Sequence, residues 1–253
     1  MQIDLNCDVG EWSGAGIPSN EQALLTYITS ANIACGGHAG DERTMQATVR
    51  FAVDHGVAIG AHPGFADRAG FGRRETSLTP REIEDLVASQ VKLLRDVARS
   101  EQAALKHVKP HGALYNLSAR DASVADAVAR AVVRVDPGLV LFGLSGSKLL
   151  AAGRASGLSV ASEVFADRAY AVDGSLVSRR NPGAVIDDVG VVVQRAVRLV
   201  VDGVVFAESG EVLHVVADTI CVHGDTSGAP ELMKQLRAGF QKAGVTVRSI
   251  CEP

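Results

Sequence analysis

The chain has 253 residues, of which 47% are hydrophobic and 21% are charged, and its formal net charge is −4. This apolar content predicts a folded core and argues against disorder. The slightly acidic charge balance gives no basic footprint, which argues against nucleic acids and anionic membranes as main partners.

The first residues, MQIDLNCDVGEW, lack the cationic and apolar regions of a signal peptide, and charged residues interrupt every long apolar stretch. The four cysteines are scattered and form no CxxC pair. We therefore expect a cytoplasmic protein with reduced thiols and no membrane association.

Short apolar segments rich in β-branched residues alternate with longer segments of helical period. This alternation predicts βα units and a parallel sheet, and a length near 250 residues is typical of one α/β barrel. The sequence thus predicts a single TIM-like β/α barrel over residues 1–253. The expected strands are 3–8, 31–36, 57–62, 106–112, 139–146, 159–165 and 219–224, with 245–250 as a candidate eighth.

Capping signals predict the helices. Thr79, Pro80 and Glu82 form a capping-box sequence followed by apolar residues at steps of three and four, so a helix is expected from Pro80 to about Arg99. The segment 204–216 instead indicates two short strands, a hairpin inserted near 203–217. The other expected helices are 44–55, 123–135, 147–156, 184–202 and 230–243.

Polar residues beside glycine end one predicted strand after another. In α/β barrels and open α/β sheets, these carboxyl ends of the strands build the active site. Asn6 and Asp8 alternate along the first strand and face one way, as do Lys109 and His111 further on. The sequence therefore predicts a polar pocket at this end, whereas His107, at a strand start, is expected on the opposite rim.

Carboxylates and imidazoles at neighbouring strand ends are the ligands that a divalent metal ion needs. The same groups can also form a hydrogen-bonded network that shares protons without a metal, and the residues leave both interpretations open. For Lys109 three roles are open: it holds an anion, acts as an acid with a lowered pKa, or neutralises the carboxylates.

The pentapeptide FADRA occurs at 65–69 and again at 165–169, and each copy precedes a pair of arginines, Arg73-Arg74 and Arg179-Arg180. Each arginine pair forms either a solvated face or subunit contact, or part of a rim that binds a carboxylate or phosphate. No GxxxxGK[ST] occurs, and no GxGxxG follows a strand, so a standard nucleotide-binding loop is excluded.

Six segments occur in a fixed order across nearly the whole chain: DLNCDVGE, SANIACGGHAGD, IGAHPGFADRAGFGRR, VKPHGALYN, EVFADRAY and TICVHGD. In sequence and order they resemble the LamB/YcsF family. The resemblance implies a distorted β/α barrel related to that of the polysaccharide deacetylases. The chain departs from the usual family pattern at Gly37 and at 65–68, and neither change removes a candidate catalytic group.

The resemblance also implies an activity, the ATP-dependent opening of 5-oxoproline (pyroglutamate) to L-glutamate, in a complex with partner subunits B and C. ATP is then a co-substrate that a partner subunit helps to bind, which agrees with the missing nucleotide-binding loop. A divalent metal ion and a homo-oligomer are further expectations. Because a lactam is an unreactive amide, its hydrolysis has to be driven, for example by phosphorylation of the amide oxygen.

The family's motifs also suggest roles for individual residues. Glu163 or Asp8 is the expected general base, and Lys109 with Arg168 the expected clamp for a carboxylate or developing oxyanion. By analogy with the deacetylases, the metal ligands are Asp8, His62 and His111. The expected catalytic residues are Asp8, Lys109, His111, Glu163, Asp167 and Arg168. The expected substrate-binding residues are Asn6, His38, Arg73, Arg74, His223 and Asp225.

Two other functions stay open at this point. One is a stand-alone metal-dependent deacetylase or amidohydrolase on the same barrel, although an aromatic content of 4% argues against a sugar-binding platform. The other is a non-catalytic subunit that presents 5-oxoproline to its partners.

Overall fold

The computed structural model describes residues 1–12, 14, 16–222 and 228–251. Seven parallel strands form a closed barrel, because the last strand of the ring pairs with both the sixth and the first. All seven expected strands are present, and the predicted β/α barrel is confirmed. The strands of the ring are β1 (Gln2–Val9), β2 (Ser30–Ala34), β3 (Ala58–His62), β4 (Leu105–Val108), β5 (Val140–Leu144), β6 (Val160–Phe165) and β9 (Thr219–Cys221).

The candidate eighth strand is β10 (Thr246–Val247). Among the residues that the structure describes, it pairs with Gln2 and Ile3, near the start of β1. Since β9 already pairs with β1 from Asp4 onward, β10 extends the sheet at the amino-terminal end and does not widen the ring.

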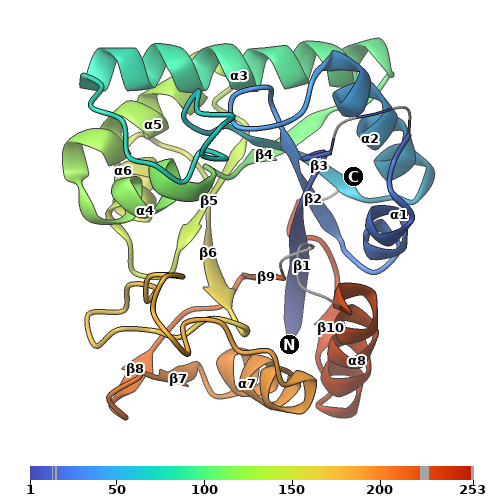
Figure 1. Cartoon of the computed structure of the whole chain (residues 1–253), viewed down its shortest axis with the longest axis vertical. Coiled ribbons are helices and arrows are strands. Elements are labelled where there is room, and N and C mark those ends of the chain that lie inside the picture. The colour runs from blue at the N-terminus through green and yellow to red at the C-terminus, as the bar shows by residue number, and fades with distance from the viewer. Residues whose placement is uncertain (13, 15, 223–227, 252–253) are drawn as a thin grey trace.

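Helices surround the strands (Figure 1). The capping box predicted at Thr79 is present: its hydroxyl accepts from the Glu82 backbone N–H at 3.3 Å, and the Glu82 carboxylate accepts from the Thr79 N–H at 2.8 Å. Within the described parts of the chain, every helix is too short or too polar to cross a membrane. The helices are α1 (Ser19–Leu25), α2 (Glu42–Asp54), α3 (Pro80–Ser100), α4 (Gly112–Arg120), α5 (Ala122–Val135), α6 (Lys148–Ala155), α7 (Val189–Val201) and α8 (Ala229–Lys242).

Three helical details differ from the sequence prediction. The sequence did not predict α1 or α4. The helix expected at 184–202 begins only at Val189, because the Asp188 side chain caps it by accepting from the Val191 N–H at 2.9 Å. The residues before Asp188 belong to a loop, in which the Ile186 N–H donates to the Asp167 carbonyl.

The hairpin consists of β7 (Val204–Phe206) and β8 (Val212–His214), which pair antiparallel. It lies outside the ring, between α7 and β9 in the chain, and Figure 1 shows it at the edge of the molecule. His214 is exposed on it, so this imidazole is remote from the barrel interior.

Candidate functional site

A cavity of about 830 Å³ opens at the carboxyl ends of β1, β3, β4 and β6. Its floor contains Asp8, His62, Lys109 and His111, which are four of the residues expected in the pocket. Its rim is rich in arginine, because the loops that follow β3 and β6 both reach it. The rim arginines are Arg73, Arg74, Arg120, Arg168, Arg179 and Arg180.

Lys109 lies at the centre of the floor and is buried. Its ammonium group contacts Glu163 Oε1 at 2.8 Å, Asp8 Oδ1 at 3.0 Å, Cys221 Sγ at 3.0 Å and Asn6 Oδ1 at 3.2 Å. These groups come from β1, β6 and β9, so the lysine holds three strands of the barrel together at its carboxyl end.

The contacts of Lys109 bear on the three roles left open for it. Burial alone would lower its pKa, but the charges of Asp8 and Glu163 outweigh burial and raise the pKa of Lys109 well above its ordinary value. Its ion pairs with Asp8 and Glu163 therefore favour the role of neutralising the carboxylates over that of an acid with a lowered pKa.

Asn6 lies beneath Lys109 and is completely buried. Its amide nitrogen donates to Glu163 Oε1 at 2.9 Å and Thr219 Oγ1 at 2.7 Å, while its amide oxygen accepts from Asn32 Nδ2 at 2.7 Å and from Lys109 Nζ at 3.2 Å. Because both amide atoms are bound to protein groups, Asn6 positions Glu163 and Lys109 from below the cavity.

His107 was expected on the opposite rim, and this expectation was wrong. It is fully buried inside the barrel, where Nε2 lies 2.9 Å from Asn32 Oδ1 and the ring stacks on Phe142 at 4.2 Å. Gly60 on the neighbouring strand makes room for it, since a Cβ atom there would lie 2.0 Å from His107 Nε2. Desolvation lowers the pKa of His107 to about 3, so the ring is neutral.

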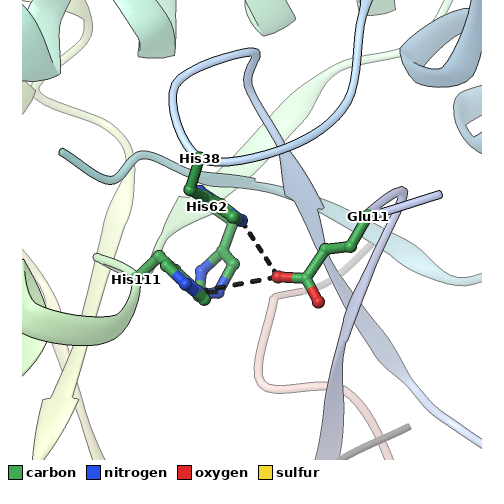
Figure 2. A group of neighbouring side chains, drawn as sticks. All are labelled: Glu11, His38, His62 and His111. Carbon is green, nitrogen blue, oxygen red and sulfur yellow. Dashed lines mark hydrogen bonds and ion pairs between the residues drawn. The ribbon is translucent and has the colours of Figure 1, made fainter. Parts of the chain in front are cut away.

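Three histidines and Glu11 form a cluster beside Asp8 (Figure 2). Glu11 Oε1 lies 2.9 Å from His38 Nε2 and 3.5 Å from His111 Nδ1. His111 Nδ1 lies 3.0 Å from His62 Nε2, and His62 Nε2 lies 3.2 Å from Asp8 Oδ2. The rings of His38 and His111 stack with their centroids 3.6 Å apart. The structure thus brings together His38, His62 and His111, which the sequence predicted for substrate binding, for metal binding, and for both catalysis and metal binding, respectively.

Burial keeps two of these imidazoles neutral. Desolvation, with the charge of His62 as the next cause, lowers the pKa of His38 to about 3 and that of His111 to about 2. Neither ring can therefore carry a proton on both nitrogens near neutral pH.

Glu11 was not predicted as a site residue. It follows β1 after Gly10, whose φ of 72° turns the chain back over the strand end. This turn is held by Glu21, whose Oε1 accepts from the Gly10 N–H at 2.9 Å and from Trp12 Nε1 at 3.1 Å. The signal in the sequence is the DVGE motif itself, in which a glycine and an acidic residue directly follow a strand that ends in a carboxylate.

The loop after β3 carries Arg73 and Arg74. Arg74 is paired with Asp67, through Nε to Oδ2 at 2.9 Å and through Nη2 to Oδ1. The guanidinium of Arg73 lies 5.0 Å from the centre of the Phe71 ring, and both arginines are exposed at the cavity. Arg74 therefore stabilises the loop through its ion pair, while Arg73 lies over an aromatic ring beside the histidine cluster.

The loop after β6 carries Asp167 and Arg168, which are both buried. Arg168 donates from Nη2 to the Val177 carbonyl at 2.6 Å and from Nε to the Ala184 carbonyl at 3.3 Å, and it also lines the cavity. Desolvation, together with the charge of Arg179, lowers its pKa from the usual value. Arg168 thus forms hydrogen bonds within this loop and is also part of the cavity wall.

Three predicted site residues remain: Glu163, which is buried below the cavity, and His223 and Asp225. Glu163 is completely buried behind Lys109 and next to Tyr115, whose pKa is raised well above its ordinary value by burial and by the Glu163 charge. His223 and Asp225 lie outside the described residues.

The sequence profile of the LamB/YcsF family matches residues 3–253. The chain is 49% identical over 245 residues to the A subunit of 5-oxoprolinase from Brevibacillus brevis, covering 97% of this chain and 96% of that protein. It is 47% identical over 252 residues to the corresponding 5-oxoprolinase subunit from Bacillus subtilis, covering 100% and 98%.

Among solved structures, the lactam utilization protein from Thermus thermophilus matches with a TM-score of 0.91 and 43% identity, covering 99% of this chain and 100% of that one. A family 4 carbohydrate esterase from Streptomyces lividans matches with a TM-score of only 0.48 and 12% identity. The expected relationship to the deacetylase barrel therefore stays a prediction.

Proposed function

Because this chain belongs to the LamB/YcsF family, we propose that it is the A subunit of a 5-oxoprolinase, which opens 5-oxoproline to L-glutamate with hydrolysis of ATP and acts together with partner subunits B and C. The observation that carries the proposal is near full-length identity of 47–49% to proteins named as the A subunit of 5-oxoprolinase. The proposal includes a cytoplasmic location, which four buried free thiols favour.

The charges of the cavity support this substrate class. 5-Oxoproline carries a carboxylate, and ATP or a phosphorylated intermediate carries more negative charge, so both need cationic groups. Six arginines line the rim, and Arg168 is buried enough to bind an anion with little competition from water. A cavity of about 830 Å³ is larger than one five-membered ring requires, which leaves room for phosphate groups or for a loop of a partner subunit.

The floor of the cavity supplies groups for opening an amide. Asp8 lines the cavity and places Oδ1 3.0 Å from Lys109 Nζ and Oδ2 3.2 Å from His62 Nε2. We assign to Asp8, paired with His62, the role of accepting a proton from the attacking water. Glu163 is the weaker candidate for this role, because it lies behind Lys109 and does not line the cavity. Lys109 and Arg168 stay in place as donors to a developing oxyanion or a carboxylate.

Reconstitution tests the proposal. The isolated chain is expected to release almost no glutamate from 5-oxoproline, and addition of subunits B and C with ATP is expected to yield equimolar glutamate and ADP. Asp8→Asn should lower the reconstituted rate by about 100-fold or more, as expected for loss of a general base. Asp126→Asn, on the exposed face of α5, is the matched control and should leave the rate unchanged.

Two results would contradict the proposal. If the isolated chain hydrolysed acetylated sugars or simple amides without ATP and partners, a stand-alone deacetylase or amidohydrolase would be the better assignment. If the complex turned over normally with both Asp8→Asn and His111→Ala in place, the chain would present the substrate without catalysing its opening.

A further inference from the structure

The cluster in Figure 2 has the dimensions of a coordination site. One donor atom from each of Glu11, His38, His62 and His111 lies within 4.8 Å of all the others. Bonds of about 2.0–2.1 Å from a zinc ion place tetrahedral ligand atoms about 3.3–3.4 Å apart. Three separations in the cluster are 2.9, 3.0 and 3.5 Å, so small side-chain shifts suffice to surround an ion.

Backbone carbonyls determine which nitrogens are free to bind an ion. His62 Nδ1 lies 2.7 Å from the Lys109 carbonyl, and His111 Nε2 lies 2.9 Å from the Phe71 carbonyl. A carbonyl oxygen only accepts, so each of these nitrogens carries a proton, and in the neutral rings the lone pair is on His62 Nε2 and His111 Nδ1. A second hydrogen bond of this kind fixes the tautomer of metal-binding histidines in many proteins.

These two lone pairs create a conflict that a cation resolves. His62 Nε2 and His111 Nδ1 are 3.0 Å apart, and Glu11 Oε1, another acceptor, lies 3.5 Å from His111 Nδ1. Acceptors at this distance repel one another unless a proton or a metal ion lies between them.

The carboxylates on the floor of the cavity also favour a cation there. Asp8, Glu11 and Glu163 are three carboxylates at this end of the barrel, and Lys109 neutralises one negative charge. Lys109 Nζ binds Asp8 Oδ1, and Glu11 Oε1 contacts His38 and His111. Asp8 stays beside the cluster through its 3.2 Å contact with His62 Nε2.

We propose that Glu11, His38, His62 and His111 bind one divalent transition-metal ion of the zinc class. Three imidazoles and one carboxylate suit zinc, cobalt or nickel, whereas magnesium and calcium prefer oxygen ligands. When bound, such an ion polarises a carbonyl or phosphoryl oxygen and lowers the pKa of water. Metal binding does not depend on the proposed function; the use of the ion in lactam opening does.

Direct binding measurements test the site. Chain freed of metal with a chelator is titrated with Zn²⁺ by calorimetry, and with Co²⁺ while the visible absorption of tetrahedral cobalt is recorded. We expect one ion per chain. Glu11→Gln, an isosteric change at a partly exposed position, should weaken Zn²⁺ binding by more than about 100-fold, which exceeds the roughly 10–100-fold loss from an outer hydrogen-bond partner. His38→Ala should abolish the cobalt bands.

His214→Ala is the matched control, since it removes an exposed imidazole of the hairpin and should leave Zn²⁺ affinity unchanged. Circular dichroism of each variant shows that it is folded. The inference is overturned if wild-type chain binds no Zn²⁺, in which case the cluster shares a proton instead, or if Glu11→Gln and His214→Ala bind Zn²⁺ equally well.

The same preparations separate this inference from the proposed function. Glutamate release by the reconstituted complex from metal-free chain, without binding of Zn²⁺, would overturn the metal site and leave the 5-oxoprolinase assignment standing. Stoichiometric Zn²⁺ binding in a chain that supports no ATP-dependent glutamate release would confirm the metal site and overturn the 5-oxoprolinase assignment.

Discussion

The two copies of FADRA have the same five residues and opposite environments. In the first copy Asp67 is partly exposed and Arg68 exposed; Asp67 pairs with Arg74, and Arg68 donates to the carbonyls of Gly36 and Gly40. In the second copy Asp167 and Arg168 are buried, with 2% and 6% of their surface exposed. The same sequence therefore forms a surface turn after β3 and part of the cavity wall after β6.

The difference arises from the path of the chain after each copy. After the first, the chain turns within a few residues, and the hydrogen bond from the Gly72 N–H to the Asp67 carbonyl closes the turn. After the second, a long loop returns over the pentapeptide, and the Val177 and Ala184 carbonyls accept from Arg168. A short motif thus determines the donors and acceptors present, while the fold determines whether water competes for them.

The largest difference between the two copies is expected in the free energy of unfolding that is lost when each arginine is replaced. Arg168→Ala removes two buried hydrogen bonds from a charged group, each contributing about 1.5–3 kcal/mol, so the free energy of unfolding should fall by about 3 kcal/mol. Arg68→Ala, at an exposed position, should cost about 1 kcal/mol or less. Urea denaturation measures both, and equal losses would mean that burial does not distinguish the two copies.

The same two variants, Arg168→Ala and Arg68→Ala, test whether Arg168 contributes to activity as well as to stability. In the reconstituted complex, Arg168→Ala should reduce glutamate release by about 100-fold, in the range seen when one donor to a developing charge is removed. Arg68→Ala should leave the rate almost unchanged. A normal rate for Arg168→Ala would show that this guanidinium only holds its loop.

A smaller difference in the free energy of unfolding is expected when the aspartate of each copy is replaced. The Asp167 charge raises the pKa of the buried Arg168 and so opposes its desolvation. Asp167→Asn removes this charge and keeps the shape of the side chain, so the free energy of unfolding should fall by about 2 kcal/mol, less than the roughly 3–5 kcal/mol for breaking a fully buried ion pair. Asp67→Asn, measured in the same urea series, should have a smaller effect; the reverse order would contradict the comparison.

The smallest expected effect is a change in the stability of the protein at acid pH. The hydrogen bonds from Arg74 lower the pKa of Asp67 to about 2 from an ordinary value of 3.8. Since the folded-state pKa is depressed, the ion pair stabilises the protein above pH 3.8, and this stabilisation is lost as pH falls from 3.8 to about 2. The difference in stability between wild type and Asp67→Asn should shrink over this range in a series of denaturation curves. A constant difference would show that the ion pair does not contribute to stability.

The sequence predicted the barrel and most of its cavity for one physical reason. Parallel strands place their carboxyl ends on one side, so Asp8, His62, Lys109 and His111 had to meet once the strands were assigned. Local capping chemistry likewise predicted α3.

Other parts depend on contacts that no local pattern reveals. Glu11 joins the histidines only because Gly10 adopts a positive φ and Glu21 holds the turn. His107 fits inside the barrel only because Gly60, remote in the sequence, lacks a side chain. The first residue of α4, Gly112, has a φ of 55° and discourages the prediction of a helix there.

The ring closes between the beginning and the end of the chain. Asn6 on β1 binds Thr219 on β9, 213 residues later, and Lys109 reaches Cys221 on the same strand. During synthesis on the ribosome, β1 and β6 therefore each have one unpaired edge until β9 emerges. Open strand edges invite pairing with other chains. The strand that completes the floor of the cavity thus also covers the two strand edges that could pair with other chains.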